Sequence, residues 1–258
     1  MMWMRIAFFA YSLCVFDDKE PSDRWVPCPA GIQNGWGPAA ERLRSDKILP
    51  PVAFTSEMQK WQKWGDENLR DGDLVHRLGD AHIARGLYPF SRNLAKLTGS
   101  KYSHSALVVF DPDGHAYIYD ATKQSVRRQP FSVYMLDMIG PWCVQRPTGL
   151  DTLKSAAYIR DKWERQVPFD FDLSDSDDAF YCVELAVKAC RAGGVDLGKS
   201  TPVWLLPEAY KWRVHLYFFN KCGLKLTSRV WYVGNKKNGI LSSPKVKTIH
   251  EFDRKGTP

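Results

Sequence analysis

The strongest strand pattern in the chain lies between residues 102 and 122. Tyr102-Ser-His-Ser-Ala-Leu-Val-Val-Phe110 is rich in β-branched and aromatic residues, which favour extended structure. Asp111-Pro-Asp-Gly114 then supplies the residues of a tight turn, and Ala116-Tyr-Ile-Tyr-Asp-Ala-Thr122 is a second strand-like run. The pattern therefore predicts a β-hairpin whose two strands pair antiparallel.

Shorter runs with strand or helix periodicity predict the other elements. A turn followed by a short strand is expected at residues 71–78, with further strands at 125–131, 142–146 and, at a sheet edge, 229–233. Helices are expected at residues 57–69, 83–97 (interrupted at Pro89), 151–163 and 207–216, and the chain from Lys236 onward is expected to be poorly ordered. Together these elements predict an α+β fold in which an antiparallel sheet packs against helices.

One further helix, expected at Asp178–Cys190, carries a cysteine in its first turn. Asp or Ser at positions 175–178 are N-cap candidates, and Gly193-Gly194 supplies an end. At this position the helix N–H groups and the helix dipole favour a thiolate over a thiol, as a nucleophile requires. Cys182 therefore has two interpretations, a nucleophile or one of the small buried cysteines that are common in protein cores.

The predicted hairpin offers Cys182 a base. A thiol nucleophile needs a group that takes its proton, and that group needs a partner that orients it. With a four-residue turn at 111–114, Asp120 faces Ser105 and points away from His104; with one residue fewer, Asp120 lies directly across from His104, within about 5 Å. The sequence leaves this choice open, and both residues could instead have purely structural roles.

Other acidic residues compete with Asp120 for the orienting role. Glu184 lies two residues after Cys182 on the helix, about 200° around it, and is expected to contact the sheet or a neighbouring loop. Asp170 and Asp172 precede the helix in an aromatic and acidic loop. A metal site made of Cys182, His104 and an acid would need a fourth ligand or a water, and no local ligand pair suggests one. We therefore expect neither a metal nor another cofactor.

The charge of the chain is unevenly distributed. Of the net +7, residues 201–258 contribute +8, from 11 Lys and Arg against 3 Asp and Glu. This basic region could contact an anionic surface such as a lipid or a cell-wall polymer, or it could be an ordinary solvated face. Nothing in the sequence has the pattern of a nucleic-acid-binding motif, so no nucleic-acid partner is expected. The six cysteines form no C-x-x-C pair, which argues against a structural zinc site.

The N-terminal region differs in character from the rest of the chain. Residues 1–16 place one Arg before about eleven apolar residues, which has the length of a signal-peptide core but lacks a clear cleavage site. Export or a membrane anchor is one expectation, and a cytoplasmic protein is the alternative. Residues 17–69 are expected to form a largely irregular extension, and residues 70–258 the folded domain with its basic C-terminal region.

Five motifs in this order resemble those of the permuted papain-like amidases, the YiiX/YebB-type relatives of the NlpC cysteine peptidases. They are Asp71-Gly-Asp-Leu-Val, Tyr102-Ser-His-Ser-Ala-Leu-Val-Val, Tyr117-Ile-Tyr-Asp-Ala, Pro168-Phe-Asp-Phe and Tyr181-Cys-Val-Glu-Leu. The resemblance implies a circularly permuted papain-like fold over about residues 70–195, with the base preceding the nucleophile in the chain. Val183 stands where the family commonly has a small polar residue, and Asp120 stands where it commonly has Glu.

The resemblance also implies roles for individual residues. Cys182 would be the nucleophile, His104 the base and Asp120 the orienting acid, and the accessory positions would be Ser103, Asp73, Tyr181 and Glu184. The function implied is hydrolysis of an amide bond in a peptide, a cell-wall peptide or an N-acyl lipid through a thioester. Two alternatives use the same scaffold: acyl transfer to a lipid or amine, and a binding module that has lost catalysis.

Overall fold

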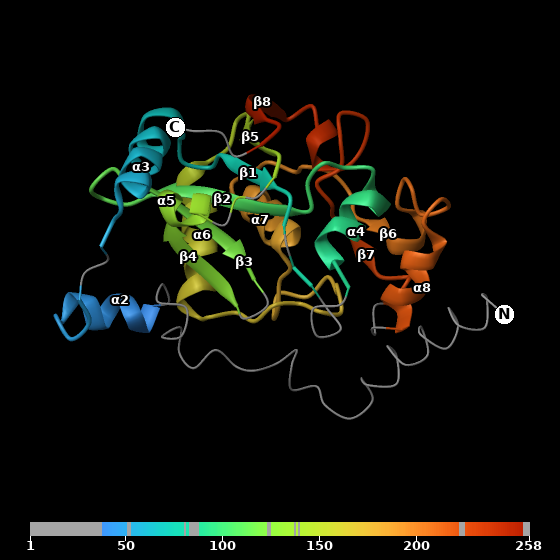
Figure 1. The fold of residues 1–258 in the computed structure, drawn as a ribbon, viewed down its shortest axis with the longest axis horizontal. Coiled ribbons are helices and arrows are strands. Elements are labelled where there is room, and N and C mark those ends of the chain that lie inside the picture. Colours follow the sequence, from blue (N-terminus) through green and yellow to red (C-terminus); the bar gives the residue numbers. More distant parts are fainter. Residues whose placement is uncertain are drawn as a thin grey trace.

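A six-stranded antiparallel sheet forms the centre of the protein in the computed structural model, which describes residues 38–50, 53–79, 81–82, 88–122, 125–136, 138, 140–221 and 225–254. The strands run in the order β4-β3-β2-β1-β5-β8 (Figure 1). Their bounds are β1 Leu74–Arg77, β2 His104–Phe110, β3 Ala116–Ala121, β4 Val126–Pro130, β5 Trp142–Pro147 and β8 Val246–Phe252. The predicted α+β fold with an antiparallel sheet is confirmed.

Helices cover both faces of this sheet. On one face α6 (Thr152–Glu164) and α7 (Cys182–Ala192) bury the side chains of β2 and β3 that point to that face, such as Leu107 and Tyr119. On the other face α3 (Ser56–Asn68) and α5 (Phe131–Leu136) bury the alternate residues, such as Val108 and Ile118. Because both faces of β2 are buried, this strand contains a nearly continuous run of apolar residues from Ala106 to Phe110.

The β2–β3 hairpin forms as predicted, but in a register that neither of the two predicted loops gives. Phe110 pairs with Ala116, so residues 111–115 form a five-residue connection. The Asp111 carboxylate accepts hydrogen bonds from the backbone N–H groups of Asp113 and His115, which keeps His115 out of the ladder. In this register Asp120 lies across from Ala106 and on the same face as His104, diagonal to it.

The start of α7 also differs from the prediction. The helix begins at Cys182, with Tyr181 as N-cap, and none of residues 175–178 caps it. Phe180 is held extended because its N–H donates to Pro168 and its carbonyl accepts from Asp170. The chain turns into a helix only after this bridge, so Cys182 is the first helical residue.

The C-terminal region contains most of the other differences. The helix expected at 207–216 begins later, as α8 (Arg213–Lys221), and β7 (Arg229–Val230) pairs with β6 (Thr201–Pro202) in a separate small sheet. Residues 237–254 are ordered, contrary to the prediction: η4 (Ile240–Ser242) leads into β8. Phe252 of β8 stacks on Trp142 with ring centroids 4.4 Å apart, which fixes this strand on the edge of the sheet.

The remaining elements precede the sheet in sequence or flank β2. The short helix α2 (Pro38–Ser45) lies within the extension expected to be irregular, and α4 (Phe90–Thr98) follows Pro89. The aromatic face of α3, with Trp61 buried, packs on the sheet as the spacing of its apolar residues predicts. Residues 1–16 lie outside the described residues, and the domain division at residue 70 stays a prediction. No helix in the described ranges is long and apolar enough to cross a membrane.

Candidate active site

His104 and Asp120 meet at the end of the hairpin where β2 begins. The His104 Nε2 atom lies 2.8 Å from Asp120 Oδ2, and the Asp120 side chain is fully buried. Burial would raise the pKa of Asp120, but the charges and hydrogen bonds of Arg127 and His104 hold it well below its usual range. Asp120 is therefore a carboxylate that fixes the orientation of the imidazole.

Arg127, which the sequence reading did not single out, holds Asp120 from the other side. It lies directly across from Asp120 in the β3–β4 pair. Its Nε donates to Oδ1 at 3.0 Å and one of its terminal nitrogens donates to Oδ2 at 2.8 Å, the two-point geometry that guanidinium and carboxylate groups favour. Asp120 thus has both oxygens occupied, one by Arg127 alone and one by Arg127 and His104 together.

Cys182 reaches this pair from the N-terminus of α7. Its side chain is partly exposed, and its Sγ lies 3.9 Å from the carbonyl oxygen of Ser103, the residue before His104. Burial raises the pKa of the Cys182 thiol, but the charge of His104 and its hydrogen bond with the sulfur outweigh burial, so the pKa lies below its ordinary value. In Cys143 and Cys190, by contrast, burial raises the pKa to about 12. Cys182 is thus chemically distinct from both.

His104 carries the complementary shift. Burial alone would lower its pKa, but the Cys182 sulfur and then the Asp120 carboxylate raise it to about 9. Since Asp120 occupies Nε2, the remaining ring nitrogen for the sulfur is Nδ1. The lowered pKa of the thiol and the raised pKa of the imidazole are shifts in the direction that favours a thiolate–imidazolium pair.

An aromatic residue closes the other side of the imidazole. The fully buried Tyr134 of α5 stacks on His104 with ring centroids 6.4 Å apart, and Arg77 lies over the Tyr134 ring at 4.4 Å. Arg77 is also the β1 residue that pairs with His104. These neighbours, which sequence spacing alone did not indicate, limit the movement of the ring.

Two of the accessory residues shape the approach to Cys182. Tyr181 is buried, and its hydroxyl accepts a hydrogen bond from the backbone N–H of Trp231 at 2.7 Å, which connects the start of α7 to the C-terminal region. The Ser103 hydroxyl accepts from the N–H of Gly79 at 3.0 Å and so joins the turn before β2 to the end of β1. Both residues position backbone beside Cys182.

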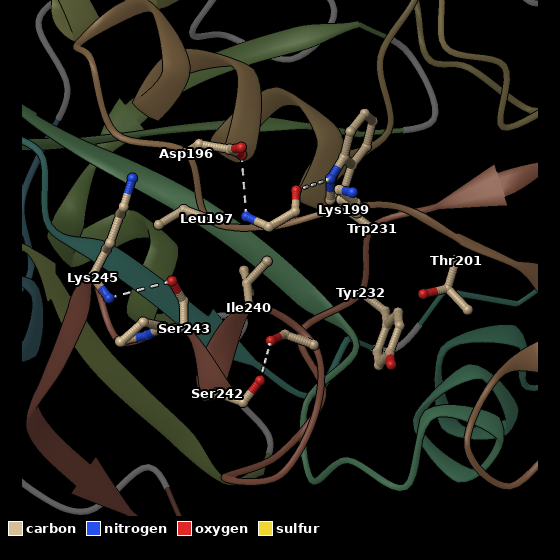
Figure 2. A pocket seen from close by; sticks show the side chains of 13 residues that line it. Asp196, Leu197, Lys199, Thr201, Trp231, Tyr232, Ile240, Ser242, Ser243 and Lys245 are labelled. Carbon is tan, nitrogen blue, oxygen red and sulfur yellow. Dashed lines mark hydrogen bonds between the residues drawn. The ribbon is translucent and has the colours of Figure 1, made fainter.

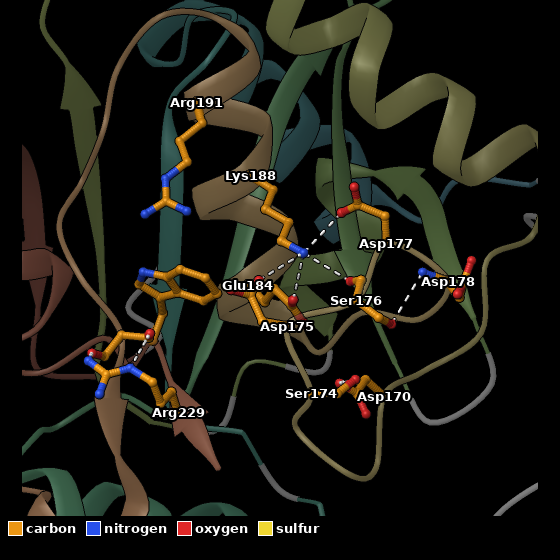
Figure 3. Close-up of polar contacts among 12 residues, drawn as sticks. Asp170, Ser174, Asp175, Ser176, Asp177, Asp178, Glu184, Lys188, Arg191 and Arg229 are labelled. Atoms are coloured by element: carbon orange, nitrogen blue, oxygen red, sulfur yellow. Dashed lines mark hydrogen bonds and ion pairs between the residues drawn. The ribbon is translucent and has the colours of Figure 1, made fainter.

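Glu184 contacts a lysine on its own helix (Figure 3). The Nζ of Lys188 lies 3.0 Å from the buried Glu184 carboxylate and also contacts Asp175, Asp177 and the carbonyl of Ser176. Burial outweighs Lys188 and raises the pKa of Glu184 to about 8. Glu184 therefore belongs to a structural cluster that holds the loop before α7, and it does not orient His104.

The other acidic residues named from the sequence are also engaged elsewhere. The buried Asp73 carboxylate accepts two hydrogen bonds from Arg146, each 2.7 Å long. Asp73 also precedes β1 at the end opposite Arg77, about 13 Å along the strand from the partner of His104. Asp170 accepts from the Asp172 backbone N–H and from the hydroxyl of Ser174, within its own loop. The structure thus brings Asp120 to His104 and leaves these rivals apart.

A hollow in the described surface lies at another place. A cavity of about 500 Å³ is bounded by residues 196–199 on one side and 239–245 on the other, with Trp231 and Tyr232 in its wall (Figure 2). None of Cys182, His104 and Asp120 lines it. Its connection to the site runs through Trp231, whose backbone N–H bonds Tyr181.

Comparison with known proteins gives a likeness to a solved structure. No family model and no curated protein matches the chain. Among solved structures, the crystal structure of the metalloprotein YiiX from Escherichia coli O157:H7 matches with a TM-score of 0.59. The chain has a YiiX-like fold. The match covers 72% of this chain and 98% of YiiX at 19% sequence identity, so the likeness is one of fold. It confirms the YiiX-type resemblance of the sequence motifs at the level of fold.

Proposed function

We propose that this protein is a cysteine hydrolase of amide bonds built on a circularly permuted papain-like fold. The observation that carries the proposal is the position of His104, hydrogen-bonded to Asp120 on one side and paired with Cys182 on the other. The YiiX-like fold and the chain order of base, acid and nucleophile support the same family. Cys182 would be the nucleophile, His104 the general acid and base, and Asp120 the residue that orients His104.

The geometry supports a two-step reaction. In the first step the Cys182 thiolate attacks the substrate carbonyl carbon, and the His104 imidazolium gives its proton to the departing amine as the C–N bond breaks. The product is a thioester on Cys182. In the second step neutral His104 takes a proton from water, which attacks the thioester and releases the acid and the thiolate.

The start of α7 supplies a donor for the negative oxygen that forms in each step. Cys182 is the first helical residue, and the N–H groups of a first helical turn have no acceptor within the helix. The Cys182 N–H is therefore positioned to donate to the developing oxyanion, an interaction that typically accelerates acyl transfer by about 10²–10³-fold.

YiiX is described as a metalloprotein, but the residues of this site do not form a set of metal ligands. Both oxygens of Asp120 are occupied by Arg127 and His104, and one ring nitrogen of His104 is held by Asp120. Within the described ranges, no group of three or more His, Cys, Asp or Glu side chains could hold a metal ion. These residues do not fit a metal-ligand set, and no step of the proposed reaction uses one.

The proposal is tested with a general acyl donor and then with substrate classes. With a p-nitrophenyl ester, wild-type protein is expected to release a burst of about one equivalent of p-nitrophenol and to carry the acyl group on Cys182, detected by peptide mass spectrometry. Peptide, cell-wall fragment and N-acyl lipid panels then identify the amide substrate, and added amines distinguish transfer from hydrolysis.

Cys190→Ala is the matched control, because Cys190 lies on the same helix and is fully buried. It should retain the burst, whereas Cys182→Ala should lose it. A burst that survives in Cys182→Ala, or an acyl group found on another residue, would contradict the proposal.

A further inference from the structure

Exposed apolar side chains are concentrated in one short segment. Of the nine large hydrophobic residues that are strongly exposed in the described ranges, five lie between positions 204 and 217. They are Trp204 (52% exposed), Leu205 (51%), Tyr210 (65%), Val214 (55%) and Tyr217 (50%). Single exposed apolar residues are normal on soluble proteins, but such a concentration indicates an interaction surface.

The helix α8 within this segment has two different faces. Trp212, which precedes the helix, and Leu216 pack against the hydrophobic core, and His215 accepts or donates a 2.8 Å hydrogen bond with Tyr88. At about 100° per residue these three positions share one side of the helix. Val214 and Tyr217 lie on the opposite side and are exposed. The core therefore uses one face of α8 and leaves a second, partly apolar face uncovered.

The same exposed face carries positive charge. Arg213 is exposed and forms no ion pair with any residue that the structure describes, whereas Lys211 pairs with Glu208. The sequence of α8, RVHLYFFNK, contains no acidic residue. The region from 201 to 258, which includes α8, has a net charge of +8. Exposed apolar side chains and an exposed arginine thus occur together between positions 204 and 217, and we call these residues the η3–α8 surface (Trp204, Leu205, Tyr210, Arg213, Val214 and Tyr217; η3 is Val203–Leu205).

We propose that the η3–α8 surface binds peripherally to a membrane that contains anionic lipid. Trp and Tyr favour the boundary between headgroups and acyl chains, and a helix with one apolar and basic face lies in that boundary. Arg213 and the basic C-terminal region would be attracted to the negative surface potential of such a membrane. In Figure 1, α8 and β6 lie at the end of the molecule away from α2 and α3.

The proposal is tested by co-sedimentation of the full-length protein with lipid vesicles. At low salt the wild-type protein is expected to bind vesicles of phosphatidylcholine with phosphatidylglycerol, and to bind vesicles of phosphatidylcholine alone much more weakly. Tyr217→Ser and Arg213→Glu should each reduce the partition coefficient by about fivefold or more. The matched controls are Leu153→Ser, at a residue 83% exposed on α6, and Lys63→Glu, on α3; both should bind like wild type.

A second measurement shows which part of the chain enters the lipid, since residues 1–16 are also apolar. Brominated phospholipids quench a tryptophan that enters the membrane, and the difference between wild type and Trp204→Phe isolates Trp204. Quenching of Trp204 is expected. No binding to anionic vesicles at low salt, binding without quenching of Trp204, or equal loss in the control variants would each overturn the proposal. A dimer that is seen in sedimentation velocity and is disrupted by Trp204→Ser would also overturn the proposal, because the surface would then form a contact between two copies of the protein.

Discussion

Replacing Asp120 with asparagine removes the charge that orients His104 while nearly preserving the shape of the side chain. The pKa of His104, raised to about 9 from the ordinary 6.5, corresponds to a preference of about 3 kcal/mol for the charged ring. The Cys182 sulfur supplies the largest part of that rise, and the hydrogen bond that His104 donates to Asp120 is the next contribution. A hydrogen bond to a charged group typically contributes about 1.5–3 kcal/mol.

We therefore expect Asp120→Asn to lower the pKa of His104 by about one to two pH units. Because the imidazolium stabilises the Cys182 thiolate, the pKa of Cys182 should rise as well, by less than the pKa of His104 falls, since the charge of Asp120 itself raises the pKa of Cys182. Alkylation of Cys182 near pH 6 should therefore slow by about 10-fold. The contribution of His104 to folding has the same origin. It is complete below about pH 6.5 and is lost as the pH rises through about 9.

The measurement is the rate of iodoacetamide alkylation of Cys182 between about pH 5 and pH 9, followed by peptide mass spectrometry. Asp120→Asn alone leaves the largely buried Arg127 without its counter-ion, so the double variant with Arg127→Gln tests whether an effect on folding causes the change. Asp66→Asn is the matched control, since Asp66 forms a 2.9 Å pair with His115, away from Cys182. A folded Asp120→Asn protein with the wild-type pH profile would refute the orienting role of Asp120.

Three other changes test the surroundings of the site. The wild-type protein should lose at most about 4 kcal/mol of stability between pH 5 and pH 8, because the raised pKa of Glu184 favours its neutral form in the folded state. Glu184→Gln should reduce this loss. If the free energy of unfolding in urea changes equally with pH in both proteins, the expectation is wrong. Tyr181→Phe should cost about 1–3 kcal/mol by leaving the Trp231 N–H unbonded, with Cys182 still reactive, whereas unchanged stability would show that this bond contributes little. Phe252→Ala should cost about 2 kcal/mol through lost stacking on Trp142, and a wild-type melting temperature would show that β8 is not fixed there.

The hairpin and the cysteine helix could be predicted because local signals specify them. The β-branched run before Asp111 favours a strand, and Gly193-Gly194 is a common local signal for the end of a helix. The loop length could not be predicted, because it depends on hydrogen bonds that the Asp111 carboxylate accepts from the backbone N–H groups of Asp113 and His115. One of the two predicted registers, with Asp120 across from His104, still places both side chains on the correct face of the sheet. The observed register differs from it by two residues, and a shift of two residues preserves the face.

Other features were missed because they depend on distant partners. Arg127 is one of two adjacent arginines in β4, and only the register of β4 against β3 places it across from Asp120. The strand β8 has alternating polar residues and little hydrophobic content, so its local pattern resembled a solvated tail. Its order comes from Trp142, which lies about 110 residues earlier in the chain and stacks on Phe252.

The central claim is that His104 converts Cys182 into a thiolate near neutral pH. The most direct test is the rate at which iodoacetamide alkylates each cysteine near pH 6, in the folded protein and in urea, resolved by peptide mass spectrometry. We predict that Cys182 reacts faster folded than unfolded despite being partly buried, that Cys143 and Cys190 react more slowly folded, and that His104→Ala removes the advantage of Cys182. A Cys182 that reacts no faster in the folded protein than in urea would contradict the account.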